Sequence, residues 1–426
     1  MATQTQDATI PQDIANTLVD PRAYADGRAD EALRWLRANN PLGLARPDGY
    51  EPFWVVTRHA DIAEVGGQNK LFHNGDKQII LTTREDAERM YAQRESGNAS
   101  RNLIQMDPPQ HGKYRMMTQS WFMPSNLRKL EPQIREIARK TVAKLLATGG
   151  ECEYVTQIAH GYPLHVIMTI LGVPQEDEPL MLKLTQEIFS PNHAGDENSQ
   201  LTPEQKRDKL QAAVAEFHDY FGKLSADRQK NPTDDLATVI ANAQIGGEPI
   251  PLAERIGYYI LVSTAGHDTT ANATAGCMLA LTQFPEEFAK VKADPALLHH
   301  LAEEAIRWTT PVKHFMRSAV EDTVLAGRNI AAGDLLMLSF LSANRDEAVF
   351  EDPYTFKADR QPNPHLGFGH GAHVCLGQFL ARMEIRILME EMLPHLKSVS
   401  LTDTPRLAPV NFISGPEYIP LKFEAA

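Results

Sequence analysis

The chain has 426 residues, of which 42% are hydrophobic, enough to form a core that can enclose a cofactor. With 42 basic and 55 acidic residues, its formal net charge is −13, which argues against a nucleic-acid-binding surface. Only three cysteines occur, Cys152, Cys277 and Cys375, which indicates a reducing compartment rather than a disulfide framework.

The sequence shows no targeting or membrane-anchoring signal. Residues 1–20 are polar and lack the basic-then-apolar order of a signal peptide. The longest apolar stretch, residues 256–265, is interrupted by Gly257 and two hydroxyl residues and falls far short of the ~20 residues needed to span a bilayer. We therefore expect a soluble, cytoplasmic protein without a membrane partner.

Few segments in the first half of the chain have the sequence pattern of a β-strand. Residues 53–57 (Phe-Trp-Val-Val-Thr) predict a strand, whereas the polar residues 75–102 and 191–203 predict surface loops, either an access lid or disordered decoration. After a proline turn, residues 107–115 begin a helix that places His111 and Arg115 one turn apart. Since no repeat or linker is found, we expect one domain, 1–426, with 1–33 as an N-terminal extension.

A long helix is predicted in the middle of the chain. Pro251 begins a proline-free stretch that Pro285 ends, and about 32 residues would extend roughly 48 Å. Its centre, residues 265–270, reads Ala-Gly-His-Asp-Thr-Thr. Glycine costs about 1 kcal/mol relative to alanine in a helix, and Asp268 and Thr269 compete for backbone hydrogen bonds. We expect a locally opened turn facing a cavity; a solvent contact or salt bridge of Asp268 is the alternative.

Later segments complete the predicted fold class. Glu304 and Arg307 share one helical face, where an ordinary surface pair would contribute about 0.2–0.5 kcal/mol. Residues 318–342 and 402–423 contain short segments whose sequence is typical of β-strands. The prediction is a mainly α (α+β) fold, with a large helical region around the long central helix and a smaller β-rich region.

A glycine-rich loop near the C-terminus delivers a cysteine to a helix N-terminus. Residues 368–377 read Phe-Gly-His-Gly-Ala-His-Val-Cys-Leu-Gly. The helix dipole favours a thiolate there, and the glycines leave room for something flat beside the backbone. These features suggest Cys375 as an axial ligand of haem iron. A buried apolar cysteine and a zinc site with His370 and His373 are the alternatives.

This loop resembles the haem-binding loop of the cytochrome P-450 family, Phe-Gly-x-Gly-x-(Arg/His)-x-Cys-x-Gly, with all six defined positions filled. Residues 265–270 are similar to the oxygen-activating element of that family, and Glu304 and Arg307 to its Glu-x-x-Arg pair. The sequences of residues 177–185 and 307–313 are most similar to those of the bacterial terpineol-hydroxylating subfamily. The resemblance implies the cytochrome P-450 fold, haem b with Cys375 as axial ligand, and a haem-thiolate monooxygenase.

The resemblance also implies roles for single residues. Asp268 would help relay protons, Thr269 would hydrogen-bond dioxygen, and Glu304 and Arg307 would hold the fold behind the haem together with residues 356–360. Four residues match propionate-binding positions: His111, Arg115, Arg317 and His373. The other cofactor-binding candidates are Ala265, Phe368, Gly369, Cys375 and Gly377. Candidates for substrate contact are Ile104, Leu261, Thr264, Val312, Phe412 and Ile413.

The largely apolar substrate candidates favour hydroxylation, with O₂, of a small hydrophobic substrate such as a terpenoid or an aromatic or cyclic hydrocarbon. Since 51 residues follow Cys375, we expect no fused reductase. The resemblance implies electrons from a separate 2Fe–2S ferredoxin with an NAD(P)H ferredoxin reductase. Lys113, Arg128 and Lys129 could form its basic docking patch, or simply a solvated helix face. The alternative functions are a haem-thiolate gas or redox sensor and a peroxide-using haem enzyme.

Overall fold

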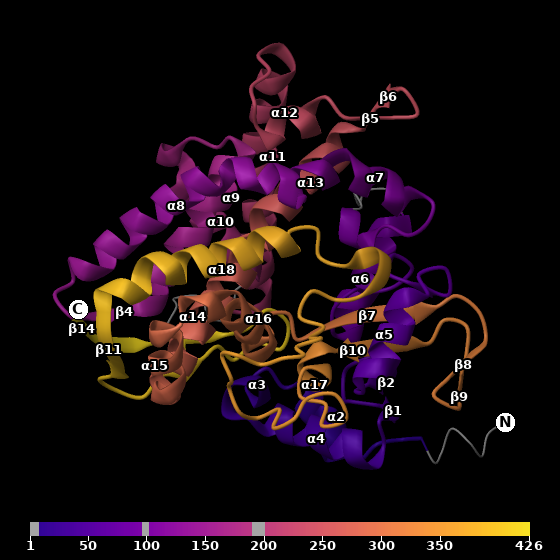
Figure 1. The fold of residues 1–426 in the computed structure, drawn as a ribbon. Helices are drawn as coiled ribbons and strands as arrows, with labels where there is room; N and C mark the ends of the chain where they lie inside the picture. The colour runs from indigo at the N-terminus through magenta and orange to yellow at the C-terminus, as the bar shows by residue number, and fades with distance from the viewer. Residues whose placement is uncertain (1–7, 96–101, 190–200) are drawn as a thin grey trace.

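A computed structural model describes residues 8–95, 102–189 and 201–426. A large helical part and a smaller part built around a five-stranded sheet lie side by side (Figure 1). No helix in the described ranges is long and apolar enough to cross a membrane.

The five-stranded sheet has the order β1-β2-β10-β7-β3. Strand β10 pairs in parallel with β2 and antiparallel with β7. Every residue of β1, β2 and β10 is buried, which explains their continuous apolar runs. The strands predicted at residues 53–57 and within 318–342 are present. Their bounds are Leu42–Ala45 (β1), Phe53–Val56 (β2), Phe72–His73 (β3), His314–Ala319 (β7) and Leu335–Ser339 (β10).

Short helices from the N-terminal region pack against this sheet. Ile10 and Leu18 are buried with Leu33 and Phe53 in one apolar cluster, so this part of the chain belongs to the core of the fold. The helices of the N-terminal region are Gln12–Val19 (α2), Ala23–Asp26 (α3), Arg28–Asn39 (α4) and His59–Gly67 (α5), and the later helix Phe340–Ala343 (α17) packs beside α4 and α5.

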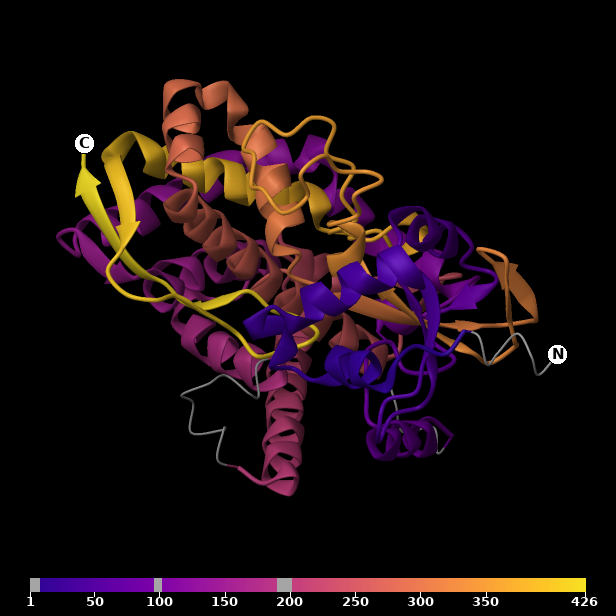
Figure 2. The same cartoon turned by 90° about the horizontal axis from the view of Figure 1, so that it is seen from below.

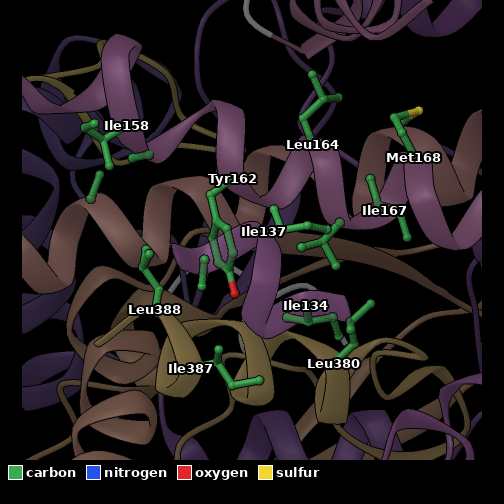
Figure 3. Close-up of a cluster of buried hydrophobic side chains, with 14 of the residues drawn as sticks. Ile134, Ile137, Ile158, Tyr162, Leu164, Ile167, Met168, Leu380, Ile387 and Leu388 are labelled. Atoms are coloured by element: carbon green, nitrogen blue, oxygen red, sulfur yellow. The ribbon is translucent and has the colours of Figure 1, made fainter. Parts of the chain in front are cut away.

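The largest apolar core lies between α8, α9 and α18 (Figure 3). Ile137 of α8, Ile167 of α9 and Ile387 of α18 belong to it, and burial of each such side chain contributes about 1.5–3 kcal/mol. The helical part comprises Gln110–Gln119 (α7), Pro124–Leu146 (α8), Gly161–Leu171 (α9), Glu178–Phe189 (α10), Pro203–Lys230 (α11), Leu236–Ala241 (α12), Pro285–Ala293 (α15), Leu298–Thr309 (α16) and Gln378–Met392 (α18).

The long central helix is interrupted where its opening was predicted. It consists of α13 (Leu252–Ala265) and α14 (Asp268–Gln283), with Gly266 and His267 between them. A Cβ on Gly266 would lie 2.8 Å from a side-chain carbon of Ile167, so glycine permits the close approach of α9. The hydroxyl of Thr269 donates to the Ala265 carbonyl (2.9 Å) and bridges the interruption.

The C-terminal segment forms brief strands, as expected. A three-stranded sheet, β11 (Leu396–Leu401), β14 (Pro420–Ala425) and β4 (Glu151–Glu153), lies far from the five-stranded sheet (Figure 2). Three two-stranded pairs complete the described strands: Gln244–Ile245 (β5) with Glu248–Pro249 (β6), Thr323–Leu325 (β8) with Arg328–Ile330 (β9), and Arg406–Leu407 (β12) with Pro416–Tyr418 (β13).

The loop predicted for residues 75–102 contains a helix, α6 (Arg84–Glu95). Its sequence is polar on nearly all sides, so apolar periodicity could not reveal it. Hydrogen bonds hold it instead: the Tyr91 hydroxyl donates to Gln78 (2.6 Å), and Arg94 donates to the carbonyls of Gly75 and Lys77. Residues 96–101, and most of the second predicted loop, lie outside the described ranges.

Candidate functional site

A loop just before α18 presents Cys375, three residues before that helix begins. The Cys375 N–H donates to the Phe368 carbonyl (2.9 Å) and closes the loop. Gly369 and Gly371 have φ angles of 72° and 74°, a region that favours glycine. A Cβ on Gly371 would lie 1.9 Å from the Gly66 carbonyl oxygen. This glycine therefore admits the backbone of α5, rather than a flat ligand as we had expected from the sequence.

The Cys375 thiol faces the interior of the protein. Part of the surface of Cys375 is not covered by other protein atoms. The thiol is nevertheless surrounded by protein, and this burial raises its pKa. Both observations hold if the sulfur faces an internal surface rather than bulk solvent. The Gly377 N–H and the guanidinium groups of Arg115 and Arg382 act in the opposite direction and lower this pKa. A Cβ on Gly377 would meet nothing within 4 Å, so the backbone beside the sulfur is open.

Four basic side chains gather near Cys375, and all were predicted. His111 and Arg115 come from α7, Arg317 from β7, and His373 from the turn Gly371–His373. The ring centroids of His111 and His373 are 3.9 Å apart. Nε2 of the His373 ring is buried without a hydrogen-bond partner, and Arg317 is 6% exposed and donates to the Met316 carbonyl (2.8 Å).

These four side chains fit a ligand with negative charges. Burial lowers the pKa of all four, that of His373 to about 2 and that of Arg317 to about 10. The nearby Asp107 carboxylate already accepts the N–H groups of Asn74 (2.8 Å) and Gly75 (2.7 Å). Buried cations are costly unless an anion pairs with them. The two propionates of haem b would supply that charge, and Cys375 would supply the axial thiolate.

The opened turn between α13 and α14 holds the predicted oxygen-activating residues. Ala265 is exposed and Thr269 half-buried, although Val262 and Ala271 on the same helices are buried. Asp268 is 6% exposed, and its Oδ1 lies 3.1 Å from Nδ1 of His267. Sequence reasoning gave His267 no role. The available signal was an imidazole at the centre of a core helix, where both ring nitrogens need partners.

The predicted substrate residues come together only in part. Val312 and Ile413 form an antiparallel bridge, and the Lys313 N–H donates to the Phe412 carbonyl (2.8 Å), so these segments are neighbours. Leu261 is half-buried on α13.

The two remaining candidates for substrate contact are Ile104 and Thr264. Ile104 is half-buried in the 3-10 turn Leu103–Gln105. Thr264 is 2% exposed, and its hydroxyl donates to the Ile260 carbonyl (2.6 Å). The side chain of Thr264 therefore offers no free hydrogen-bond donor to a substrate.

Glu304 and Arg307 form a fully buried pair rather than a surface one. The Arg307 guanidinium makes two bonds of 2.7 Å to the two carboxylate oxygens. The Arg360 Nε (3.0 Å) and the Lys357 N–H (2.9 Å) also donate to this carboxylate. Both residues lie in the segment 356–360, which the sequence placed beside the pair. The cluster joins α16 to the loop that leads toward Cys375.

Comparison with known proteins assigns the chain to the cytochrome P450 family, whose model matches residues 49–416. It is 46% identical to Cytochrome P450-terp of Pseudomonas sp, a match that covers 98% of this chain and 99% of the relative. It is 32% identical to a steroid C26-monooxygenase of Mycolicibacterium smegmatis, with 92% and 87% covered.

Solved structures agree with this assignment. CYP108D1 from Novosphingobium aromaticivorans superimposes with a TM-score of 0.90 at 42% identity, covering 98% of this chain and 100% of that one. Cytochrome P450 CYP268A2 of Mycobacterium marinum, solved in complex with pseudoionone, gives 0.86 at 29% identity, with 95% and 96% covered.

The family membership confirms the predicted fold, cofactor and enzyme class. The chain is a cytochrome P450 monooxygenase that acts on O₂ and a substrate. Members of this family bind haem through a cysteine thiolate. Among the three cysteines, Cys375 lies in the glycine-rich loop before α18, beside the four basic side chains.

Proposed function

We propose that this monooxygenase hydroxylates a small hydrophobic substrate, a terpenoid or an aromatic or cyclic hydrocarbon. The observation that carries the proposal is the chemistry of the candidate contact residues: Leu261, Val312 and Phe412 are apolar, and the hydroxyl of Thr264 is bonded to its own helix. A site of this kind binds through apolar area and shape rather than charge. The relative solved with pseudoionone, a mostly hydrocarbon ketone, supports the same substrate class.

The residues around the haem would have distinct tasks. When bound, the haem with its thiolate ligand supplies the chemistry that activates O₂. His111, Arg115, Arg317 and His373 would neutralise its propionates. The carboxyl of Asp268 and the hydroxyl of Thr269 lie in one turn. The Thr269 hydroxyl donates to the Ala265 carbonyl, and its oxygen can still accept a hydrogen bond, so the two groups together would hold and pass on protons. The apolar residues would exclude water that delivers protons elsewhere.

A binding screen tests the substrate class. We expect terpenes and alkylbenzenes to displace the axial water and shift the Soret band of the oxidised protein. The same skeletons bearing a carboxylate should bind at least about tenfold more weakly, since a charge would be buried without a partner. With isotopically labelled O₂, the hydroxylated product should contain one labelled oxygen atom. Preferential binding of the charged analogues would contradict the proposal.

Replacing Thr269 by alanine should uncouple electron use from product formation. The haem site keeps its ligands, so the spectrum is retained, but the hydroxyl that passes on protons is lost. A positioned acid–base group contributes roughly 10²–10⁴-fold to a rate, so we expect product per NADH to fall by at least about tenfold, with hydrogen peroxide formed instead.

Thr274→Ala is the matched control for this substitution, because Thr274 lies further along α14, buried and away from the opened turn. It should leave the product yield unchanged. If Thr269→Ala also left product per NADH unchanged, the proposed role of Thr269 would be wrong.

The electron donor in this proposal is a 2Fe–2S ferredoxin that is reduced by a separate NAD(P)H-dependent reductase. Lys113 on α7 and Arg128 and Lys129 on α8 are exposed, and in the described part of the chain none of them forms an ion pair. Met116 on α7 and Phe379 on α18, the helix that follows Cys375, are exposed apolar side chains. Exposed cations around apolar side chains suit an acidic partner.

Replacing Arg128 and Lys129 together by glutamate should weaken ferredoxin-dependent reduction. We expect the ferredoxin concentration for half-maximal rate to rise about tenfold at low salt, and less at high salt, since exposed charges are screened. Lys230→Glu at the exposed end of α11 is the control and should have little effect. An equal effect of both variants would exclude a specific docking surface at α8.

A further inference from the structure

His314, the first residue of β7, is a buried histidine whose ring contacts backbone groups of two distant segments. The residue is 1% exposed, and each ring nitrogen lies 3.0 Å from a backbone atom. Nδ1 lies beside the carbonyl oxygen of Asn411, and the Leu81 N–H donates to Nε2. These partners are 97 and 233 residues away in the sequence, so the imidazole joins three segments of the chain.

These two contacts fix the tautomer and the orientation of the imidazole. A backbone N–H can only donate, so Nε2 has a lone pair, and a carbonyl can only accept, so Nδ1 carries the hydrogen. Burial lowers the pKa of His314 to about 4, which keeps the ring neutral at neutral pH. A half-turn of the ring would place carbon atoms against both backbone groups. His314 therefore presents one N–H in a fixed direction, toward Asn411.

The acceptor of this N–H lies beside two candidates for substrate contact. Asn411 directly precedes Phe412 and Ile413, between the short strands β12 and β13. The ring of Phe412 lies 5.6 Å from the ring of His314 and 5.5 Å from that of Phe315, centroid to centroid. The imidazole thus contacts the side chain of Phe412 as well as the backbone that precedes it.

The Leu81 N–H, on the other side of the ring, belongs to a segment that is itself attached to the five-stranded sheet. The Met316 N–H of β7 donates to the Ile79 carbonyl (2.8 Å). The Leu81 side chain packs against the apolar cluster between the sheet and the N-terminal helices. The two partners of the ring therefore have different tasks: the Leu81 N–H orients the ring, and the ring holds Asn411.

We propose that His314 is a positioning residue that places Phe412 and Ile413 against the substrate and so determines which carbon is hydroxylated. The inference rests on the proposed hydroxylation of a small hydrophobic substrate and extends it. An apolar substrate offers no charge that could hold it in one orientation, so the positions of the surrounding side chains select the carbon that reacts. Loss of the bond to Asn411 would let the segment 411–413 move, and hydroxylation would spread over more carbons.

Two substitutions of His314 separate this role from one confined to holding the segment around Leu81. In His314→Asn, the amide lies near the former Nδ1 and can donate to the Asn411 carbonyl, but it does not reach the Leu81 N–H. In His314→Gln, the longer amide can accept from the Leu81 N–H but has no donor near Asn411. The proposal predicts that asparagine preserves the product pattern and glutamine does not. A role confined to the segment around Leu81 predicts the reverse.

Hydrogen exchange of the haem-containing protein without substrate is the first readout. The Lys313 N–H donates to the Phe412 carbonyl (2.8 Å) and the Ser414 N–H to the Pro311 carbonyl (2.9 Å), so both amides report whether the segment 411–413 stays in place. Both should exchange at least about tenfold faster in His314→Gln, but within about threefold of the unsubstituted rate in His314→Asn. Unchanged exchange in the glutamine variant, or an equal or larger increase in the asparagine variant, would overturn the proposal.

The product distribution is the second readout. With a terpene or alkylbenzene that shifts the Soret band, the ratio of the major hydroxylated product to the others should fall at least about tenfold in His314→Gln and change less than about threefold in His314→Asn. His165→Gln is the matched control, because this half-buried histidine on α9 is paired with Glu178 and not with the segment 411–413. The control should change neither readout.

Phe412→Leu tests the same role without changing His314. Phe412 is half-buried, and leucine keeps an apolar side chain but removes the ring that contacts His314. This variant should change the product ratio at least about threefold, and an unchanged ratio would contradict the proposal. If no hydrophobic compound shifts the Soret band of the unsubstituted protein, the proposed substrate class fails, whereas hydrogen exchange still decides the role of His314.

Discussion

Replacing Arg307 by alanine should lower the free energy of unfolding by about 3–5 kcal/mol, because the fully buried Glu304 carboxylate then loses its bidentate partner. Domains are stable by only about 5–15 kcal/mol, so the loss is a large share of the total. The same guanidinium donates to the carbonyls of Asn344 and Pro353 (both 2.9 Å), which would also lose their donor. We expect little folded, haem-containing protein. Thermal unfolding and haem content measure the effect.

Two further variants test whether the planar guanidinium of Arg307 and its burial are needed for stability. Arg307→Lys keeps the charge but not the planar group that makes two parallel bonds, and should therefore recover only part of the stability. Lys223→Ala removes an ion pair with Asp219 that is exposed on α11, and should change stability by about 1 kcal/mol or less. If Arg307→Ala were as stable as Lys223→Ala, the buried cluster around Glu304 and Arg307 would not stabilise the fold as its hydrogen bonds indicate.

Replacing Cys375 by alanine should abolish oxidation of substrate with NADH, ferredoxin and O₂. The change removes the thiolate but leaves the four basic side chains that we propose neutralise the propionates. Any haem that remains bound should therefore lack the spectrum of thiolate ligation. Cys152→Ala is the matched control, because Cys152 is a half-buried free cysteine on β4 whose thiol has a pKa raised by burial to about 11. That variant should keep full activity. Substrate oxidation by Cys375→Ala would mean that another residue binds the iron.

Features that depend on fixed spacing could be predicted from the sequence. The loop around Cys375 binds its ligand through consecutive residues, so its pattern is visible in the chain. Glu304 and Arg307 are three residues apart on a helix, and the structure adds that they are buried, with Arg360 and the Lys357 N–H as further partners. The predicted opening of the long helix followed from Gly266, Asp268 and Thr269, residues that weaken a helix locally.

Features that depend on contacts distant in sequence could not be predicted. Gly371 is required by the backbone of Gly66, and no local pattern reveals that approach. The Thr264 hydroxyl donates a hydrogen bond to a carbonyl of its own helix, and the residue type alone did not show that this donor is already occupied. The contact between His267 and the His160 carbonyl joins segments 107 residues apart. Helix α6 lacks an apolar face and is held by hydrogen bonds.

The most direct test of the central claim is the absorption spectrum of the purified, reduced protein with carbon monoxide. A haem whose iron is bound by the Cys375 thiolate should give the strongly red-shifted Soret band of thiolate ligation. The band should be present in Cys152→Ala and absent in Cys375→Ala. An unshifted Soret band in the unsubstituted protein, or no haem spectrum at all, would contradict the assignment of this chain as a haem-thiolate monooxygenase.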